Sequence, residues 1–204
     1  MTVKDRRARH KAALRKEILD AARLLFVREG FENFSMRELA EKIEYSPTTI
    51  YLYFKDKADL LSHLCDDSFS KLVQQLETIA ALATNPVESL RASMLAYVEF
   101  GVKNPANYLA TFVVPLPLGR SESGLHPGPT GMGRRVLDSL RQAITECVRA
   151  GEFGKQDLDK ASQTIWAVLH GITSLLVVHP DFPWVNREEL VDQMIDTAIG
   201  GLKA

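Results

Sequence analysis

Cysteine is scarce in this chain of 204 residues, which contains only Cys65 and Cys147, far apart in the sequence. Their number and spacing indicate neither a disulfide scaffold nor a zinc site. Both cysteines stand among apolar residues with a helical pattern, so we interpret them as buried side chains without a chemical role. The simplest interpretation is a reduced, cytoplasmic protein.

Long apolar runs and the usual catalytic motifs are missing as well. No apolar run approaches the ~18 residues of a membrane span, and the charged first residues lack the apolar segment of a secretory signal. The sequence has no glycine-rich phosphate loop, nucleophile elbow or HExxH motif. None of its five histidines stands beside a candidate nucleophile and a carboxylate. We therefore expect no membrane partner, no metal, no cofactor and no enzymatic activity.

Charge is nearly balanced overall but unevenly distributed, with a formal net charge of −1. Residues 1–57 hold 13 Lys and Arg against 9 Asp and Glu, whereas residues 58–204 hold 12 against 17. A basic amino-terminal part on an acidic body indicates a segment that meets phosphate groups. The arginine-rich residues 1–10 have two interpretations, a disordered tail or a basic arm that reaches a DNA groove or backbone.

The stretch from Ser35 to Lys57 predicts two short helices joined by a turn. Ser35 is a good N-cap and Glu38 stands at the capping-box position. An apolar stripe at helical spacing follows, formed by Met36, Leu39, Ala40 and Ile43. Ser46-Pro47 then begins the second helix with a capping hydroxyl and a proline at the first helical position. Small hydroxyls and aromatics on this second helix suit a groove lined with phosphates, so the pair predicts a DNA-binding helix-turn-helix.

A longer amphipathic helix precedes this stretch, from Lys11 to Glu29, and Gly30 is expected to end it as a C-cap. One face of the helix is apolar: Leu14, Ile18, Ala21, Ala22, Leu25 and Phe26. We assign the remaining apolar side chains of this region to a common core: Phe31, Phe34, Leu39, Ala40, Ile50 and Phe54. The three helices then form a homeodomain-like head of roughly 50 residues.

Helical patterns continue through the rest of the chain, over residues 56–82, 86–103, 133–150, 158–178 and 186–202, with a short helix starting at Asn104-Pro105. Residues 113–133 contain four prolines and five glycines, so they predict a long loop. This loop is either the lid or entrance of a pocket or a disordered surface insertion. His126 within it has no ligand-like partner.

The helix predicted over residues 158–178 is apolar on most of its surface. Such a helix is buried on most sides, yet a subunit of this size leaves the last long helices few partners. A dimer interface supplies the missing cover. Together with the helix over residues 186–202 it predicts a four-helix interface in a homodimer, two helices from each subunit.

Two segments of the head resemble the TetR family of transcriptional regulators. They are G-F-E-N-F-S-M-R-E-L-A at residues 30–40 and S-P-T-T-I-Y-L-Y-F-K-D-K-A-D-L-L at residues 46–61. The resemblance covers about Leu14 to Leu64, and the Y-x-x-F-x-x-K spacing is quite specific. It implies an all-α homodimer of about nine helices per subunit, whose two heads read successive major grooves of a palindromic operator. It also implies a long connecting helix that acts as a lever.

The division into domains follows from the same resemblance. Residues 1–57 would form the DNA-binding domain, and residues 58–204 an effector-binding and dimerisation domain. The expected function is a sequence-specific transcriptional regulator, a repressor that is released from operator DNA by an unknown small-molecule effector. The alternative is a DNA-binding protein of the same fold that has no effector or responds to a protein partner.

The resemblance also assigns roles to residues of the head. Ser35 would touch a phosphate and Arg37 a base edge, since Arg on guanine is the commonest specific contact. The remaining candidates for bases, phosphates or groove wall are Ser46, Pro47, Thr48, Thr49, Tyr51, Tyr53, Lys55 and Lys57. The family usually has glycine and a small apolar residue in the inter-helix turn, where this chain has Glu44-Tyr45. A left-handed Glu44 would cost about 1 kcal/mol relative to glycine, unless the turn has another geometry.

Candidates for an effector pocket are less specific, because aromatic residues line pockets and fill cores alike. The density of aromatics suits a pocket wall, and the candidates are Tyr97, Phe100, Tyr108, Phe112, Trp166 and His170. Residues 166–171 resemble the W-x-x-x-H-G signature of one carboxy-terminal subgroup of the family. His170 is then either a satisfied core histidine packed on Trp166 or a pH-responsive group at the pocket or interface.

Overall fold

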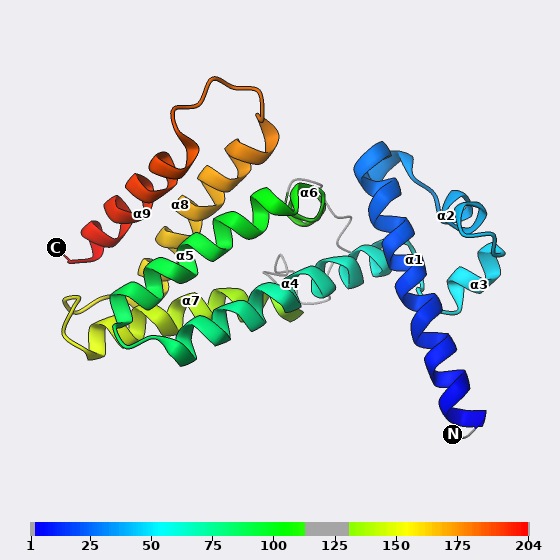
Figure 1. The fold of residues 1–204 in the computed structure, drawn as a ribbon, viewed down its shortest axis with the longest axis horizontal. Coiled ribbons are helices and arrows are strands. Elements are labelled where there is room, and N and C mark those ends of the chain that lie inside the picture. Colours follow the sequence, from blue (N-terminus) through cyan, green and yellow to red (C-terminus); the bar gives the residue numbers. More distant parts are fainter. Residues whose placement is uncertain (1–2, 113–130, 204) are drawn as a thin grey trace. The chain divides into compact units, whose positions relative to one another are not determined.

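The computed structural model describes residues 3–112 and 131–203, and within these ranges the chain is all-α without a strand (Figure 1). The helices are α1 (Val3–Asn33), α2 (Met36–Lys42), α3 (Pro47–Tyr51), α4 (Lys57–Leu82), α5 (Pro86–Lys103), α6 (Pro105–Phe112), α7 (Gly131–Arg149), α8 (Leu158–Val178) and α9 (Arg187–Lys203). The predicted all-α class, with a helix-turn-helix and a larger helical part, is confirmed. The predicted loop at residues 113–133 lies almost wholly outside the described residues.

The described helices divide into two compact units. The first contains α1, α2 and α3, α4 as far as Asp67, and α6 from Ala106. The second contains α4 from Ser68, α5, α7, α8 and α9. Helix α4 therefore supplies residues to both units, and α6 does so only through Pro105, which belongs to the second.

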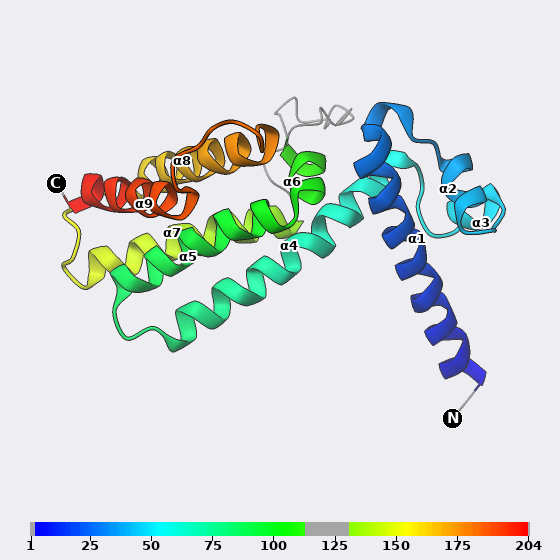
Figure 2. The same ribbon diagram turned by 45° about the horizontal axis from the view of Figure 1, so that its top comes forward.

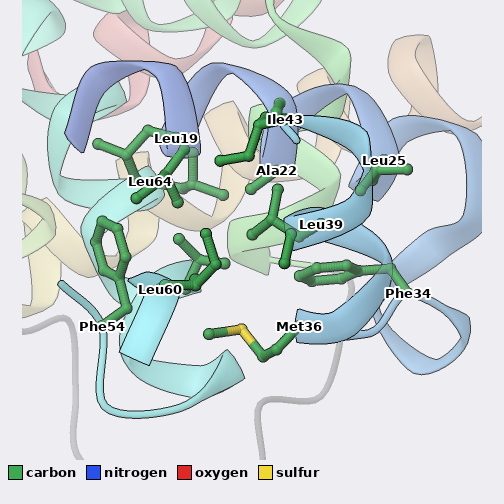
Figure 3. Close-up of a cluster of buried hydrophobic side chains, with 14 of the residues drawn as sticks. Leu19, Ala22, Leu25, Phe34, Met36, Leu39, Ile43, Phe54, Leu60 and Leu64 are labelled. Carbon is green, nitrogen blue, oxygen red and sulfur yellow. The ribbon is translucent and has the colours of Figure 1, made fainter. Parts of the chain in front are cut away.

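The first unit is built around one apolar cluster from α1, α2, α3 and the start of α4 (Figure 3). Leu39, Ile50 and Leu60 are fully buried, and Phe54 is 1% exposed. Burying a side chain of this size contributes about 1.5–3 kcal/mol relative to leaving it exposed. The predicted core positions Phe34, Leu39, Ala40, Ile50 and Phe54 are thus confirmed, whereas the side chain of Phe31 lies outside the described part.

Helix α1 begins earlier than the sequence pattern predicts. It starts at Val3 instead of Lys11, because Ala, Arg and Lys are good helix formers even where no core face is present. The interpretation of residues 3–10 as a disordered tail is therefore wrong. Gly30 has non-helical backbone angles, φ 75° and ψ 169°, so the regular helix breaks at the residue predicted to end it, and a short helical segment follows as far as Asn33.

In the second unit α5 contacts α7, α8 and α9, and α8 also contacts α7 and α9 (Figure 2). The centre of this unit is apolar: Leu90, Met94, Ile144, Ile165, Leu169 and Ile195. Cys147 is fully buried there, as predicted, and burial raises the pKa of its thiol to about 11. The side chain of Cys65 is outside the described part.

By length and composition alone, α8 is long and apolar enough to cross a membrane. Its contacts give a different explanation for this composition. Leu169 and Leu176 are buried among neighbouring helices, and the hydroxyl of Thr173 is buried and donates to the Leu169 carbonyl at 2.7 Å. A core helix of a helical bundle has the same composition as a membrane span.

The turn between α2 and α3 adopts the geometry that its sequence makes costly. Glu44 has φ 58°, the one positive φ outside glycine in the described chain. The Glu44 N–H donates to the Glu41 carbonyl at 3.2 Å and the Tyr45 N–H to the Ala40 carbonyl at 2.9 Å. These are the two hydrogen bonds of a Schellman motif, which usually has glycine at the left-handed position. The turn therefore has the left-handed geometry that glycine adopts most easily, and Glu44 carries the strain.

Glu44→Gly is expected to raise the free energy of unfolding by up to about 1 kcal/mol, because glycine adopts this φ without steric cost. Urea denaturation followed by circular dichroism measures the change. Glu44→Ala is the matched control, since it removes the carboxylate but keeps the strained backbone. If Glu44→Ala stabilises the protein as much as Glu44→Gly, charge and not backbone strain is responsible.

Candidate nucleic-acid interface

Helices α2 and α3 each begin with a serine that caps the first turn. The Ser35 hydroxyl accepts from the Glu38 N–H at 3.1 Å, and the Ser46 hydroxyl accepts from the Thr49 N–H at 3.2 Å. The Ser46 and Thr49 hydroxyls also lie 2.9 Å apart in a mutual hydrogen bond. Both predicted caps are present, and they define where each helix starts.

Helix α3 has a buried side and an exposed side. Ile50 is fully buried and points into the first unit's core, as does Phe54 just beyond the helix. Thr48, Tyr51 and Leu52 lie on the opposite side at spacings of three and four, and all are exposed. The core thus presents one face of α3 to solvent with hydroxyl, phenol and aliphatic groups on it.

Leu52, the C-cap of α3, was not among the predicted contact residues although it is 75% exposed. Leucine is normally assigned to a core when only its type is considered. The available signal was its spacing from Thr48, four residues earlier, which places both on one helical face. Aliphatic groups on such a face can contact the methyl group of thymine.

The other predicted contact residues surround this face within the same unit. Ser35, Arg37, Ser46 and Lys55 are exposed, while Pro47, Thr49, Tyr53 and Lys57 are half-buried. None of the ten is buried. They come from the start of α2, from α3 and from the first residues around α4, so three short segments present them together.

Besides the capping serines and Thr49, three of these residues also have structural contacts, Lys57, Tyr53 and Lys55. The Lys57 ammonium lies 5.0 Å from the centroid of the Phe34 ring, and Tyr53 packs against the apolar cluster. Cation–π contacts of this kind contribute about 0.5–1 kcal/mol at exposed sites. At Lys55 the backbone N–H donates to the Asp59 carboxylate at 2.8 Å, which helps to cap α4. Of the two lysines, Lys55 is the one with an exposed side chain.

The predicted pocket residues are distributed over both units. Tyr97, Phe100, Trp166 and His170 belong to the second unit, Tyr108 belongs to the first, and the side chain of Phe112 lies outside the described part. Tyr97 and Tyr108 are buried, whereas Phe100 is half-buried and stacks on Phe69 with centroids 6.0 Å apart. Tyr97 is 5% exposed, and burial of this degree suits either a core residue or a pocket wall.

Trp166 and His170 lie on one face of α8, with ring centroids 6.1 Å apart. Both are half-buried, and burial lowers the pKa of His170 from its ordinary value. The lowered pKa favours the neutral form of the imidazole. Among the described residues, no other helix approaches Gly171 closely.

Comparisons with known proteins place both parts of the chain. Residues 18–64 match the model of bacterial regulatory proteins of the tetR family, and residues 90–198 match the tetracyclin repressor-like C-terminal domain. The second match alone spans more than half of the chain.

Curated relatives are transcriptional regulators by name. The chain is 26% identical over 143 residues to the fatty acid metabolism regulator protein of Bacillus subtilis, covering 70% of this chain and 72% of the relative. It is 29% identical over 90 residues to an HTH-type transcriptional regulator of Staphylococcus aureus, covering 44% of this chain and 49% of the relative. The chain spans about a third to a half of the length of most curated relatives it matches.

A solved structure shares the fold over nearly the whole chain. The transcriptional regulator FadR of Bacillus subtilis, in complex with stearoyl-CoA, superposes with a TM-score of 0.72 at 19% identity. The similarity covers 91% of this chain and 98% of that one.

Proposed function

The chain belongs to the TetR family of bacterial regulatory proteins, and from this membership we propose that it represses transcription by binding a palindromic operator as a homodimer. The observation that carries the proposal is the exposed face of α3, held outward by the burial of Ile50. A five-residue helix with hydroxyls, a phenol and a leucine on its free side fits the major groove. We also propose that the protein is cytoplasmic, because a bacterial regulator meets its operator DNA in that compartment.

The individual roles follow from position and chemistry. Arg37 reaches a base edge from α2, and Thr48 with Thr49 faces bases at the start of α3. Groups better placed for the DNA backbone are Ser35, Ser46, Pro47, Tyr51, Tyr53, Lys55 and Lys57. Glu44, exposed at the adjacent turn, adds a negative charge that disfavours non-specific binding.

The domain boundary proposed here lies at residues 57 and 58. Residues 1–57 carry the contacts with DNA, and residues 58–204 bind an effector and form the dimer. Effector and operator each favour a different arrangement of the heads, so each weakens the binding of the other by the same factor. Helix α4 is the segment through which this coupling passes.

The effector is proposed to be a small molecule with a large apolar part. Two observations support this: the second unit has an apolar interior with aromatic rings at Tyr97, Phe100 and Trp166, and similar regulators are named for fatty acid metabolism. The related FadR structure contains stearoyl-CoA. We also propose that residues 166–171 place this chain in the W-x-x-x-H-G subgroup.

The dimer is proposed to form through α8 and α9. From Ala167 onward the exposed positions of α8 are apolar or small: Ala167, Gly171, Leu175, which is 47% exposed, and Val178, which is 43% exposed. On α9, Gly200 and Gly201 likewise have open space around them. Small and apolar residues along a helix let a partner helix approach closely and bury the aliphatic groups between them.

Arg37→Ala should weaken binding to an operator selected from a random-sequence library by roughly 5- to 150-fold, the equivalent of about 1–3 kcal/mol, and relax specificity at one position of each half-site. Lys55→Ala should weaken binding to all DNA sequences by the same factor. Fluorescence anisotropy at fixed salt measures both effects, and Lys71→Ala, an exposed lysine of the second unit, is the control. Failure of the wild-type protein to select any palindromic sequence would refute the proposal.

Stearoyl-CoA should weaken operator binding by roughly 5- to 150-fold, the usual range of allosteric coupling, whereas coenzyme A without an acyl chain should not. Anisotropy titrations with and without each compound measure the coupling. A protein that binds its operator equally well with either compound and with shorter acyl thioesters contradicts the proposed effector. That result favours the alternative of regulation without an effector or by a protein partner.

Leu175→Glu should convert the dimer to a monomer, since it places two carboxylates in the proposed apolar interface. Light scattering coupled to size-exclusion chromatography measures the mass. Leu82→Glu is the matched control, because Leu82 at the end of α4 is still more exposed, at 77%, but lies outside the proposed interface. A Leu175→Glu protein that keeps the dimer mass contradicts an interface through α8.

A further inference from the structure

The first turns of α1 carry basic residues that lie outside the helix-turn-helix. Residues 4–13 are all exposed, so this part of the helix buries nothing in the first unit's core. Lys4, Arg7 and Lys11 follow one another at spacings of three and four, which places them on a single helical face. In water such a stripe is mildly destabilising, because like charges at this spacing repel.

The stripe continues directly into the face of α1 that packs against the rest of the head. After Lys11 the same alternation of three and four residues leads to Leu14 and Ile18, which are 5% and 0% exposed in the apolar cluster. The cationic face therefore points to the same side of α1 as the residues that contact the helix-turn-helix. Figures 1 and 2 both show the first turns of α1 extending past α3.

Arg15 links this stripe to the interface. It is the next basic residue four positions after Lys11, and its guanidinium lies 5.5 Å from the centroid of the Phe54 ring. Phe54 follows α3 by three residues and anchors it in the core. The basic face of α1 and the end of α3 thus meet at one place in the first unit.

From this geometry we infer that Lys4, Arg7 and Lys11 bind phosphates of the DNA backbone beside the segment contacted by α3. The three residues span roughly 10 Å along the helix axis at 1.5 Å per residue. Duplex DNA carries one charge per about 3.4 Å of axis on each strand, so two or three phosphates lie within that length. The inference rests on the proposed DNA-binding function and extends it to a surface outside the helix-turn-helix.

The test is the salt dependence of operator binding by the full-length triple variant Lys4→Gln, Arg7→Gln and Lys11→Gln. Each lost phosphate contact reduces the slope of log K against log salt by about 0.9, so a decrease of roughly 2 to 3 per head is expected. Specificity should hardly change, because backbone contacts carry no base information. Glutamine has nearly the helix propensity of lysine and arginine, and circular dichroism checks that α1 is kept.

The matched control removes the same charge from the other faces of α1 by Arg6→Gln, Arg9→Gln and Lys16→Gln. Its slope should remain near that of the wild type. The inference would be overturned if both variants had the same slope, whether reduced or unchanged. It would also be overturned if Lys4, Arg7 and Lys11 were needed only for binding to anionic vesicles. If the wild type selects an operator and Arg37→Ala weakens operator binding, but the triple variant of Lys4, Arg7 and Lys11 binds as the wild type does, only this inference fails. If the wild type selects none, the proposed function itself fails.

Discussion

The interface depends on one constraint, the burial of Ile50 and Phe54 under α1 and the start of α4. Helix α3 has only five residues, and a helix of that length is not stable alone in water. It exists because Ile50 is fully buried, Phe54 is 1% exposed, and Ser46 caps its first turn. The exposed positions of α3 are therefore held by the core, and a loss of core packing would cost the interface its shape before any contact residue changed.

Much of this arrangement could be predicted from the sequence, because its determinants are local. Apolar spacing and capping residues placed the bounds of α5 and α8 correctly and those of the other long helices, apart from α1, within about two residues. What could not be predicted involves contacts between distant residues or the absence of a pattern. The stacking of Lys57 on Phe34 joins two segments, and the first turns of α1 have no apolar periodicity. Pockets and cores are lined by the same types of residue, so the sequence alone cannot tell whether Tyr97 fills a core or lines a pocket.

Glu44 shows how local preference and global fold conflict in this head. The left-handed turn joins α2 to α3 in the geometry that buries Ile43 and Ile50 together, so the core compensates for a residue that disfavours the turn. Glycine would relieve the strain but remove a carboxylate from the edge of a basic surface. In the proposed function that carboxylate weakens attraction to arbitrary DNA, while Lys4, Arg7 and Lys11 strengthen it. Discrimination then rests on groups that read bases, such as Arg37.

The same reasoning limits how an effector could act. Helix α4 contributes Leu60, Leu61 and Leu64 to the core of the first unit, while its later residues Leu72 and Leu76 are buried in the second. A ligand that binds two arrangements of the second unit equally well would shift nothing, however tightly it bound. The proposed effector must therefore change the packing around Leu72 and Leu76 if α4 is to transmit the change. Reciprocity then requires that operator DNA, which acts on the other end of the same helix, weaken effector binding by the same factor.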